Sequence, residues 1–324
     1  PILARHVRST LLPLLIALGL GCSGEPPPQL LLLVTVDTLR ADHIGVYGSP
    51  LGLTPRIDAL AAESVRFTAS YAPASYTLPS IAAIHSGFYP EEVGILANQN
   101  LFRGSSVTLA EILRLAGWRT GAAVSNYVLR SGTGIETGFD EYDDAFTQSE
   151  PNRDQPERTA EHTTDAALAV LDRLLEAPAA GIFLWVHYQD PHGPYMPPGD
   201  RRERYLADAL EAADGRRELP SYGMEAIGAI PDYQMVEDRH DVGFYRAGYE
   251  AEVAYLDAAV GTLLAAVDEA VGLHETAIVF AADHGEALGE QDFWFGHGER
   301  LGEDQVHVPL WFSLPGVPPG RRDD

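Results

Sequence analysis

The sequence contains no lysine: all 22 basic residues are arginine, against 47 acidic residues, and the net charge is −25. A chain with this charge repels phosphates, which argues against a nucleic-acid-binding or anionic-membrane surface. A bound anion must therefore be held locally, by a metal ion or by a few Arg and His side chains. The single cysteine, Cys22, excludes an internal disulfide and a metal site built from several cysteines.

The composition is that of a globular protein. Of the 324 residues, 45% are hydrophobic and 9% are aromatic, which is too apolar for a disordered chain. This length accommodates one large α/β domain or two smaller ones, with a core of useful size in either case. The sequence shows no internal repeat and no change of composition, which favours a single domain over residues 30–324.

The N-terminal segment has the pattern of an export signal. Basic residues precede an apolar run over 11–20, which is shorter than the ~20 residues that span a bilayer. The pattern resembles a bacterial lipoprotein signal, so we expect a signal peptide over 1–21, lipid attachment at Cys22 and a polar linker over 22–29. The protein is then an exported lipoprotein of the periplasm or cell envelope, anchored to the membrane at Cys22. A plain cleaved signal is the alternative.

Apolar runs predict buried strands and amphipathic patterns predict helices. The expected strands are 30–36, 119–124, 182–187, 276–282 and 308–312. The expected helices are 55–62, 79–85, 107–116, 158–176 and a long one around 253–267. Strands that alternate with helices predict an α/β fold with a mostly parallel central sheet and helices on both faces.

Two segments fall outside this alternation. The charged stretch 196–243 has weak periodicity, and we expect it to leave the sheet and cover the functional site. The last residues, 316–324, have loop composition without a closing element, which predicts that the C-terminal part of the fold is truncated.

Polar residues follow three of the predicted strands. Asp37 ends the first strand, a histidine-rich segment over 187–192 ends another, and Asp283-His284 end a third, with His297 soon after. In open α/β sheets, ligands bind at the carboxyl ends of the strands. Asp and His side chains gathered there suit a divalent cation. Each residue alone also suits a turn or a helix cap, but together they favour a site.

These segments, in this order, resemble the sulfatase family of the alkaline-phosphatase superfamily. The resemblance runs almost the length of the chain. It is carried by Val36-Asp37-Thr38-Leu39-Arg40-Ala41-Asp42-His43, Thr54-Pro55-Arg56-Ile57-Asp58-Ala59-Leu60, Thr77-Leu78-Pro79-Ser80, Trp185-Val186-His187-Tyr188-Gln189-Asp190-Pro191-His192-Gly193-Pro194-Tyr195, Ala282-Asp283-His284-Gly285-Glu286, Gly296-His297-Gly298 and His307-Val308-Pro309-Leu310.

The resemblance implies a metal-dependent attack on a sulfate or phosphate ester. The implied metal ligands are Asp37, Asp283 and His284. Thr77 occupies the nucleophile position and is also expected to contact the metal, while His192 and His297 are expected to face the ester oxygens or the leaving group. A second ligand set from Asp190, His192 and His297 lacks the spacing of two-metal relatives, so we expect one ion: Ca, Mg, Mn or Zn, with Ca if the chemistry is sulfatase-like and Mn or Zn if it is transferase-like.

The family pattern breaks at the nucleophile. Sulfatases carry Cys or Ser there and convert it to formylglycine, whereas Thr77 bears a methyl group on Cβ and cannot yield that aldehyde, so no formylglycine is expected. Ile81 replaces the arginine of the motif, Thr38 replaces its second aspartate, and Ser125-Asn126 stand near where a lysine is expected. An unmodified threonine resembles the nucleophile of phosphoethanolamine and phosphoglycerol transferases and of nucleotide phosphodiesterases, which tilts the chemistry toward phosphoesters.

Several functions stay open at this point. The first is a hydrolase of sulfated or phosphorylated glycans, lipids or small molecules; the second is a phosphoethanolamine- or phosphoglycerol-type transferase. The third is a non-catalytic metal-binding surface lipoprotein, in which Thr77 only caps a helix that begins near Pro79. A broken gene product is the fourth. The loops 127–157 and 196–243 carry no specificity motif, and the candidates for anion contact are Arg130, Arg153, Arg158 and Arg239.

Overall fold

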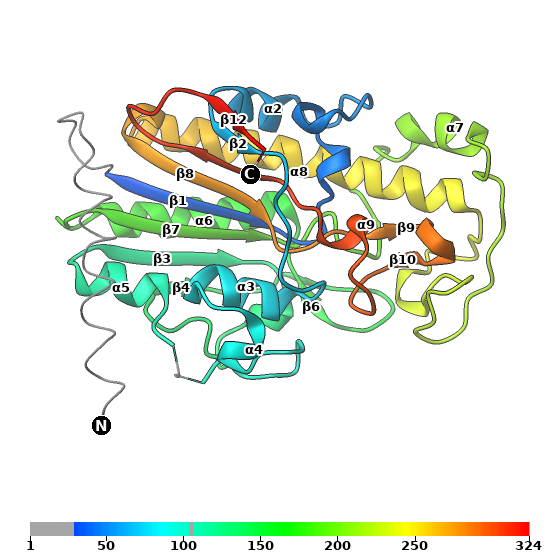
Figure 1. Cartoon of the computed structure of the whole chain (residues 1–324), viewed down its shortest axis with the longest axis horizontal. Helices are drawn as coiled ribbons and strands as arrows, with labels where there is room; N and C mark the ends of the chain where they lie inside the picture. The colour runs from blue at the N-terminus through cyan, green and yellow to red at the C-terminus, as the bar shows by residue number, and fades with distance from the viewer. Residues whose placement is uncertain (1–28, 104–105, 324) are drawn as a thin grey trace.

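The computed structural model describes residues 29–103 and 106–323 (Figure 1). The expected signal peptide, the lipid attachment at Cys22 and all but the last residue of the linker lie outside the described residues. Among the described helices, none combines the length and the apolar character that a membrane span requires.

An eight-stranded sheet forms the centre of the fold, in the order β12-β2-β11-β8-β1-β7-β3-β4. Its middle strands are parallel: β1 (Leu30–Val36) lies between β7 (Ile182–Tyr188) and β8 (Thr276–Ala282), and β3 (Arg119–Val124) pairs with β7. The mostly parallel sheet predicted from the sequence is confirmed. The outer strands are β4 (Glu141–Asp143), β11 (Leu310–Ser313), β2 (Val65–Phe67) and β12 (Gly320–Arg322).

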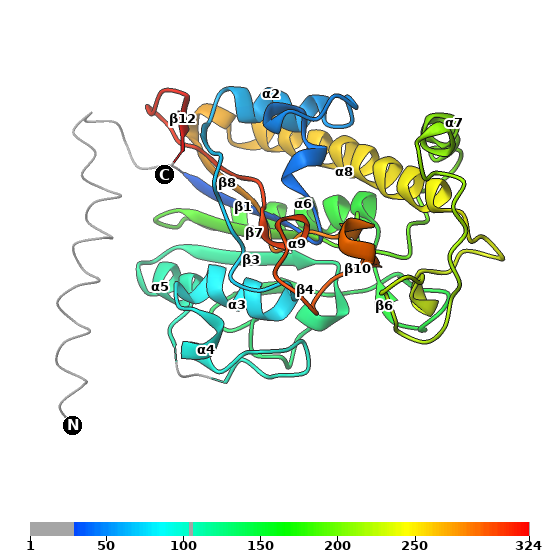
Figure 2. The same cartoon turned by 45° about the vertical axis from the view of Figure 1, so that its right-hand side comes forward.

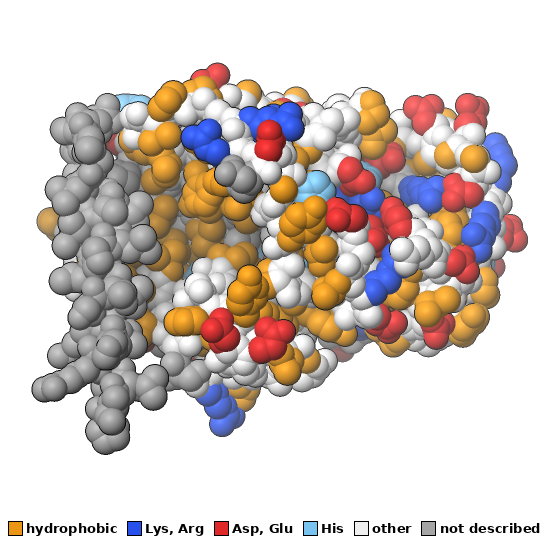
Figure 3. Space-filling view, viewed as in Figure 1, with side chains coloured by type: hydrophobic (Ala, Val, Ile, Leu, Met, Phe, Trp, Pro, Cys, Tyr) orange, Lys and Arg blue, Asp and Glu red, His pale blue; other side chains and the backbone are white. Residues whose placement is uncertain are grey.

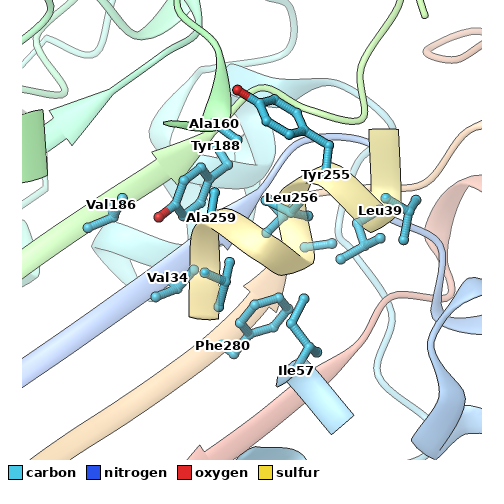
Figure 4. Packing of buried hydrophobic residues seen from close by; sticks show 14 of the residues in the cluster. Val34, Leu39, Ile57, Ala160, Val186, Tyr188, Tyr255, Leu256, Ala259 and Phe280 are labelled. Atoms are coloured by element: carbon cyan, nitrogen blue, oxygen red, sulfur yellow. The ribbon is translucent and has the colours of Figure 1, made fainter. Parts of the chain in front are cut away.

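Helices cover both faces of the sheet because each central strand is apolar on both sides. Even-numbered positions of β1, such as Leu32 and Val34, join a core with α2 (Pro55–Ala62), α6 (Ala160–Leu175) and α8 (Val242–Ala270). Figure 4 shows Leu256 and Ala259 of α8 packed among these residues.

Leu33 points to the opposite face and joins a second core. That core includes residues of α3 (Thr77–Ser86), α4 (Pro90–Val93) and α5 (Leu109–Leu115). In both cartoon views α8 runs along the sheet on the side opposite α3 and α5 (Figures 1 and 2). Both predicted helical layers are therefore present.

Shorter elements extend the fold beyond the carboxyl ends of the parallel strands, where α7, β9 and β10 lie (Figure 1). They are β5 (Gln148–Ser149), β6 (Pro156–Glu157), α7 (Glu203–Glu211), β9 (Ala287–Leu288), β10 (Trp294–Gly296) and α9 (Glu303–Val306). Single 3-10 turns span Ala41–His43, Gly45–Tyr47, Tyr127–Leu129, Asp232–Gln234, Leu273–Glu275 and Glu290–Asp292.

Some sequence-based expectations at element ends were wrong. The long helix expected around 253–267 spans Val242–Ala270 and so begins eleven residues earlier. The C-terminal stretch is not all loop, since Gly320–Arg322 forms β12 and pairs in parallel with β2 at the edge of the sheet. The helix expected from Pro79 begins two residues earlier, at Thr77. Proline is tolerated in the first turn of a helix, because the backbone N–H groups there have no intrahelical acceptor.

Candidate active site

The floor of the site lies at the ends of two neighbouring parallel strands. Val36 pairs with Ala282, so Asp37 after β1 and Asp283 after β8 emerge side by side. Nε2 of His284 lies 3.5 Å from Oδ1 of Asp37 and 3.7 Å from Oδ2 of Asp283. The Nδ1 of His284 donates to the carbonyl of Gly285 at 3.0 Å, which leaves Nε2 as the free ring nitrogen. The three predicted ligands are thus brought together, all fully buried.

Thr77 lies at the N-terminus of α3, directly above this floor. The residue before it, Tyr76, is the N-cap and has extended backbone geometry. Oγ1 of Thr77 lies 3.4 Å from Oδ2 of Asp37 and 3.4 Å from Nε2 of His284. The hydroxyl therefore faces the predicted ligands. The idea that Thr77 serves only as a helix cap is wrong, because Thr77 is the first helical residue and its side chain is turned to the site.

The sequence placed His187 in the polar segment that ends a predicted strand but assigned it no role, and the structure brings it into this cluster. Its partner in the β1–β7 register is Thr35, and its Nε2 lies 3.9 Å from Oδ2 of Asp37. Ligand atoms of Asp37, His187 and Asp283 all lie within 4.8 Å of one another. The available signal was a histidine inside the otherwise apolar run of β7.

The orientation of His187 is fixed by its other ring nitrogen. Nδ1 is 2.9 Å from Oγ1 of Thr35, which also accepts a hydrogen bond from Nε1 of Trp185 at 2.8 Å. In the tautomer in which Nδ1 donates to Thr35, Nε2 keeps its lone pair for a metal.

The cluster has the properties of a cation site. Three of its buried atoms have no hydrogen-bond partner: Oδ1 of Asp37, Oδ2 of Asp283 and Nε2 of His187. Burial, followed by the negative charge of Asp37, raises the pKa of Asp283 well above its ordinary value. Burying two carboxylates this close together costs free energy unless a cation compensates their negative charge. The residues therefore fit a divalent ion held by oxygen and nitrogen donors.

Asn126 occupies the place where the family resemblance led us to expect a lysine. It follows β3 and is almost fully buried. Its Nδ2 donates to Oδ2 of Asp37 at 2.5 Å. A neutral amide thus orients the Asp37 carboxylate and adds no positive charge to the floor of the site.

His192 and His297 face each other across the site, with ring centroids 5.1 Å apart. Nδ1 of His192 donates to the carbonyl of Gly193 at 2.6 Å, which leaves Nε2 as its accepting atom. Burial lowers the pKa of His192 to about 3, so this ring is neutral near pH 7. His192 therefore presents an unprotonated Nε2 to the site.

The pKa of His297 shifts in the opposite direction because of Glu286, a residue of the family motif to which sequence reasoning assigned no role. The fully buried Glu286 accepts from Nδ1 of His297 at 3.2 Å and from the hydroxyl of Tyr195 at 3.0 Å. Burial alone would lower the pKa of His297, but the charge and hydrogen bond of Glu286 outweigh it and raise that pKa. Two histidines whose pKa values move apart are suited to act as an acid and a base.

A cavity of about 300 Å³ opens above these residues. It is lined by Thr77, Asn126, His192 and His297 from the site and by Met224, Ala226, Pro231 and Tyr233 from the segment 196–243. That segment thus covers the site, as predicted. Charged side chains gather on the part of the surface where α7, β9 and β10 lie (Figure 3).

The four candidate arginines differ in their positions. Arg153 lines the cavity, with its guanidinium 4.1 Å from the centroid of the Tyr233 ring and bound through two nitrogens to Glu150 at 2.5 and 2.6 Å. Arg158 lines a neighbouring cavity, whereas Arg130 stacks on Tyr127 and Arg239 pairs with Asp241.

Comparisons with known proteins agree with this architecture. Human iduronate 2-sulfatase is 26% identical over 334 residues, which cover 88% of this chain and 59% of that protein. The chain therefore spans about three fifths of the length of this curated relative.

Solved structures share the fold. A protein in complex with its substrate D-glucosamine-2-N,6-O-disulfate has a TM-score of 0.68 and 18% identity, and the match covers 90% of this chain and 72% of that one. A phosphonate monoester hydrolase of Agrobacterium radiobacter has a TM-score of 0.65 and 21% identity, with 91% and 70% covered. The model of the sulfatase family matches residues 29–324. The chain belongs to the sulfatase family, with an alkaline-phosphatase-like fold.

Proposed function

We propose that this protein is a metal-dependent hydrolase of phosphate esters in which the unmodified hydroxyl of Thr77 is the nucleophile. The observation that carries the proposal is the position of Oγ1 of Thr77, 3.4 Å from both Asp37 and His284 at the start of a helix. Backbone N–H groups at a helix N-terminus favour an anionic ester. The chemistry favours phosphorus over sulfur, because a threonine cannot become the formylglycine that sulfatases use.

A bound divalent cation would neutralise the two carboxylates and polarise an ester oxygen. Asp37, Asp283 and His284 would hold it, and His187 supplies a fourth donor. Two imidazoles in the donor set favour Mn or Zn over Ca, which takes oxygen ligands.

The chain's own residues divide the reaction into two steps. In the first, Oγ1 of Thr77 forms a bond to phosphorus and releases its proton to water in the cavity. The bond from phosphorus to the leaving oxygen breaks, and that oxygen takes a proton from His297. In the second, water attacks phosphorus and gives one proton to Nε2 of His192, and the oxygen of Thr77 leaves with a proton from solvent. The histidines then exchange protons with solvent, and both return to their starting states.

The proposal includes the place of action. The segment 1–21 and Cys22 support an exported lipoprotein held at the membrane surface, with an anionic ester outside the cytoplasm as substrate. The distribution of the chain between membrane and soluble fractions, compared with Cys22→Ser, tests this part.

The central test compares an aryl phosphodiester with an aryl sulfate, on the full chain carrying Cys22→Ser and supplied with Mn or Zn. We expect phosphodiester turnover that Thr77→Ala abolishes. In acid-quenched samples analysed by mass spectrometry, we expect a phosphorylated Thr77 that still carries the second ester group of the substrate. Aryl sulfate turnover that survives Thr77→Ala would overturn the assignment of the nucleophile.

A further inference from the structure

A second cavity of about 300 Å³ adjoins the first. The two cavities share Gln189 and His192, so a substrate bound at Thr77 would have to extend past His192 to enter the second cavity. Three carboxyl groups line the second cavity: Glu157 of β6, Asp190 after β7, and Glu252 of α8. No step of the proposed reaction uses them.

The arginines near these carboxyl groups make their contacts with other groups. Arg158 also lines the cavity, but its guanidinium donates to Asp143 and to the carbonyl of Val124, both at 2.6 Å. Arg153 is held by Glu150. Arg202 donates to the carbonyl of Tyr195 and lies 3.8 Å from the centroid of the Phe244 ring. Among the described residues, no salt bridge therefore joins an arginine to Glu157, Asp190 or Glu252.

The side chains of Glu252 and Asp190 are hydrogen-bonded to each other, and each also has a buried oxygen without a donor. Glu252 is only 3% exposed, and its Oε2 has no hydrogen-bond donor; the same holds for Oδ2 of Asp190. Burial, and then the charge of Asp190, raises the pKa of Glu252 in spite of the attraction of Arg202. A buried carboxylate without a donor is costly, and either a proton or a bound cation removes that cost.

The arrangement suits an organic cation better than a metal ion. Within residues 29–103 and 106–323, three metal-ligating atoms converge within 4.8 Å only at Asp37, His187 and Asp283. In the second cavity Asp190 and Glu252 lie within hydrogen-bonding distance of each other, but no third ligand atom of the described residues joins them, and the cavity is large enough for several non-hydrogen atoms. Glu157 is partly satisfied, since it accepts from Nε2 of Gln189 at 2.8 Å, whereas Glu252 has a free buried oxygen.

We propose that this cavity binds the ammonium group of the substrate, with Glu252 and Asp190 as its acceptors. The substrate class is then a zwitterionic phosphoester, such as an aminoalkyl or amino-sugar ester, rather than a simple anionic one. This inference rests on the proposed function, because it assumes that the phosphorus centre lies at Thr77.

The test compares two size-matched esters, 4-nitrophenyl 2-aminoethyl phosphate and 4-nitrophenyl propyl phosphate, which share the leaving group and differ in one charge. We expect kcat/KM for the amino ester to exceed that for the propyl ester about tenfold or more, since a charge-assisted hydrogen bond recognises the amine. This preference falls about tenfold in Glu252→Gln and persists in Glu250→Gln, a matched control on the same helix outside the cavity. Melting temperatures verify that both variants fold.

Equal turnover of both esters by the unsubstituted chain would overturn the inference, as would a second Mn or Zn ion per chain that Glu252→Gln removes. If neither ester is turned over, the proposed function fails. Ligand-observed NMR with ethanolamine and propan-1-ol then tests separately whether the cavity binds an ammonium group. Ethanolamine binding that Glu252→Gln removes would keep the cavity assignment, and absence of binding would overturn it.

Discussion

The replacement Glu286→Gln tests the division of labour between the two histidines. Glu286 is fully buried and its Oε1 lies 3.2 Å from Nδ1 of His297. Glutamine keeps the shape and one accepting oxygen but removes the charge. A hydrogen bond to a charged group contributes about 1.5–3 kcal/mol. At 1.36 kcal/mol per factor of ten, its loss lowers the rate of protonation-dependent turnover by roughly 10- to 150-fold.

The assay is kcat/KM against pH for two methyl phosphodiesters, one with 4-nitrophenol and one with phenol as leaving group. Phenolate is a stronger base than 4-nitrophenolate, so its departure depends more on protonation. We therefore expect the larger loss of kcat/KM for the phenyl ester. The charge and hydrogen bond of Glu286 raise the pKa of His297. Without that charge the pKa falls, so the alkaline limb of the profile moves to lower pH.

A matched control separates charge from packing. Tyr195→Phe removes the other hydrogen bond to Glu286, at 3.0 Å, and leaves the carboxylate in place. We expect it to lower stability, measured by thermal melting, and to leave the alkaline limb near its original pH. Equal losses for both leaving groups in Glu286→Gln, with an unmoved alkaline limb, would refute the assignment of His297 as the acid.

Two further predictions concern the metal and the acidic cavity. Chelation is expected to lower both turnover and melting temperature, because an ion at 100 times its Kd adds about 2.7 kcal/mol to the free energy of unfolding. Mn or Zn should restore both, and Asp283→Asn should blunt the thermal shift; a shift of equal size in that variant contradicts the assigned ligands. Burial, followed by the charges of Glu150 and Asp190, raises the pKa of Glu157 from 4.5 to about 8. The folded chain then holds a proton that the unfolded chain has lost, so stability falls as pH rises through this window. The difference in melting temperature between Glu157→Gln and the unsubstituted chain should therefore favour the variant more at pH 8 than at pH 5. The same difference at both pH values would contradict this prediction.

The central strands were predictable because their signal is local. The runs 30–36, 119–124 and 276–282 are β1, β3 and β8 with the expected bounds. Each is a short apolar segment buried on both faces that ends at a polar residue. The placement of Asp37 and Asp283 followed from this, since neighbouring parallel strands bring their carboxyl ends to one edge.

Residues whose roles depend on distant partners were not predictable in the same way. His187 contributes through the β1–β7 register, and Glu286 through contacts with Tyr195 and His297 that converge only in the folded chain. The start of α3 was misplaced for a different reason. Proline favours the first helical position, so the pattern pointed to Pro79, whereas the fold uses two more residues and brings Thr77 into the first turn.

The position of β1 between β7 and β8 has a consequence for how the protein matures. The first strand of the sheet finds its two neighbours only after most of the chain has been synthesised, because Val36 pairs with Tyr188 and Ala282. Contacts of such long sequence separation form slowly. A nascent chain that has not yet reached β8 contains Asp37 and Thr77 but lacks Asp283 and His284. If the cluster holds a metal as proposed, its ligand set is complete only after β8 has been synthesised, so metal binding would come late in biogenesis.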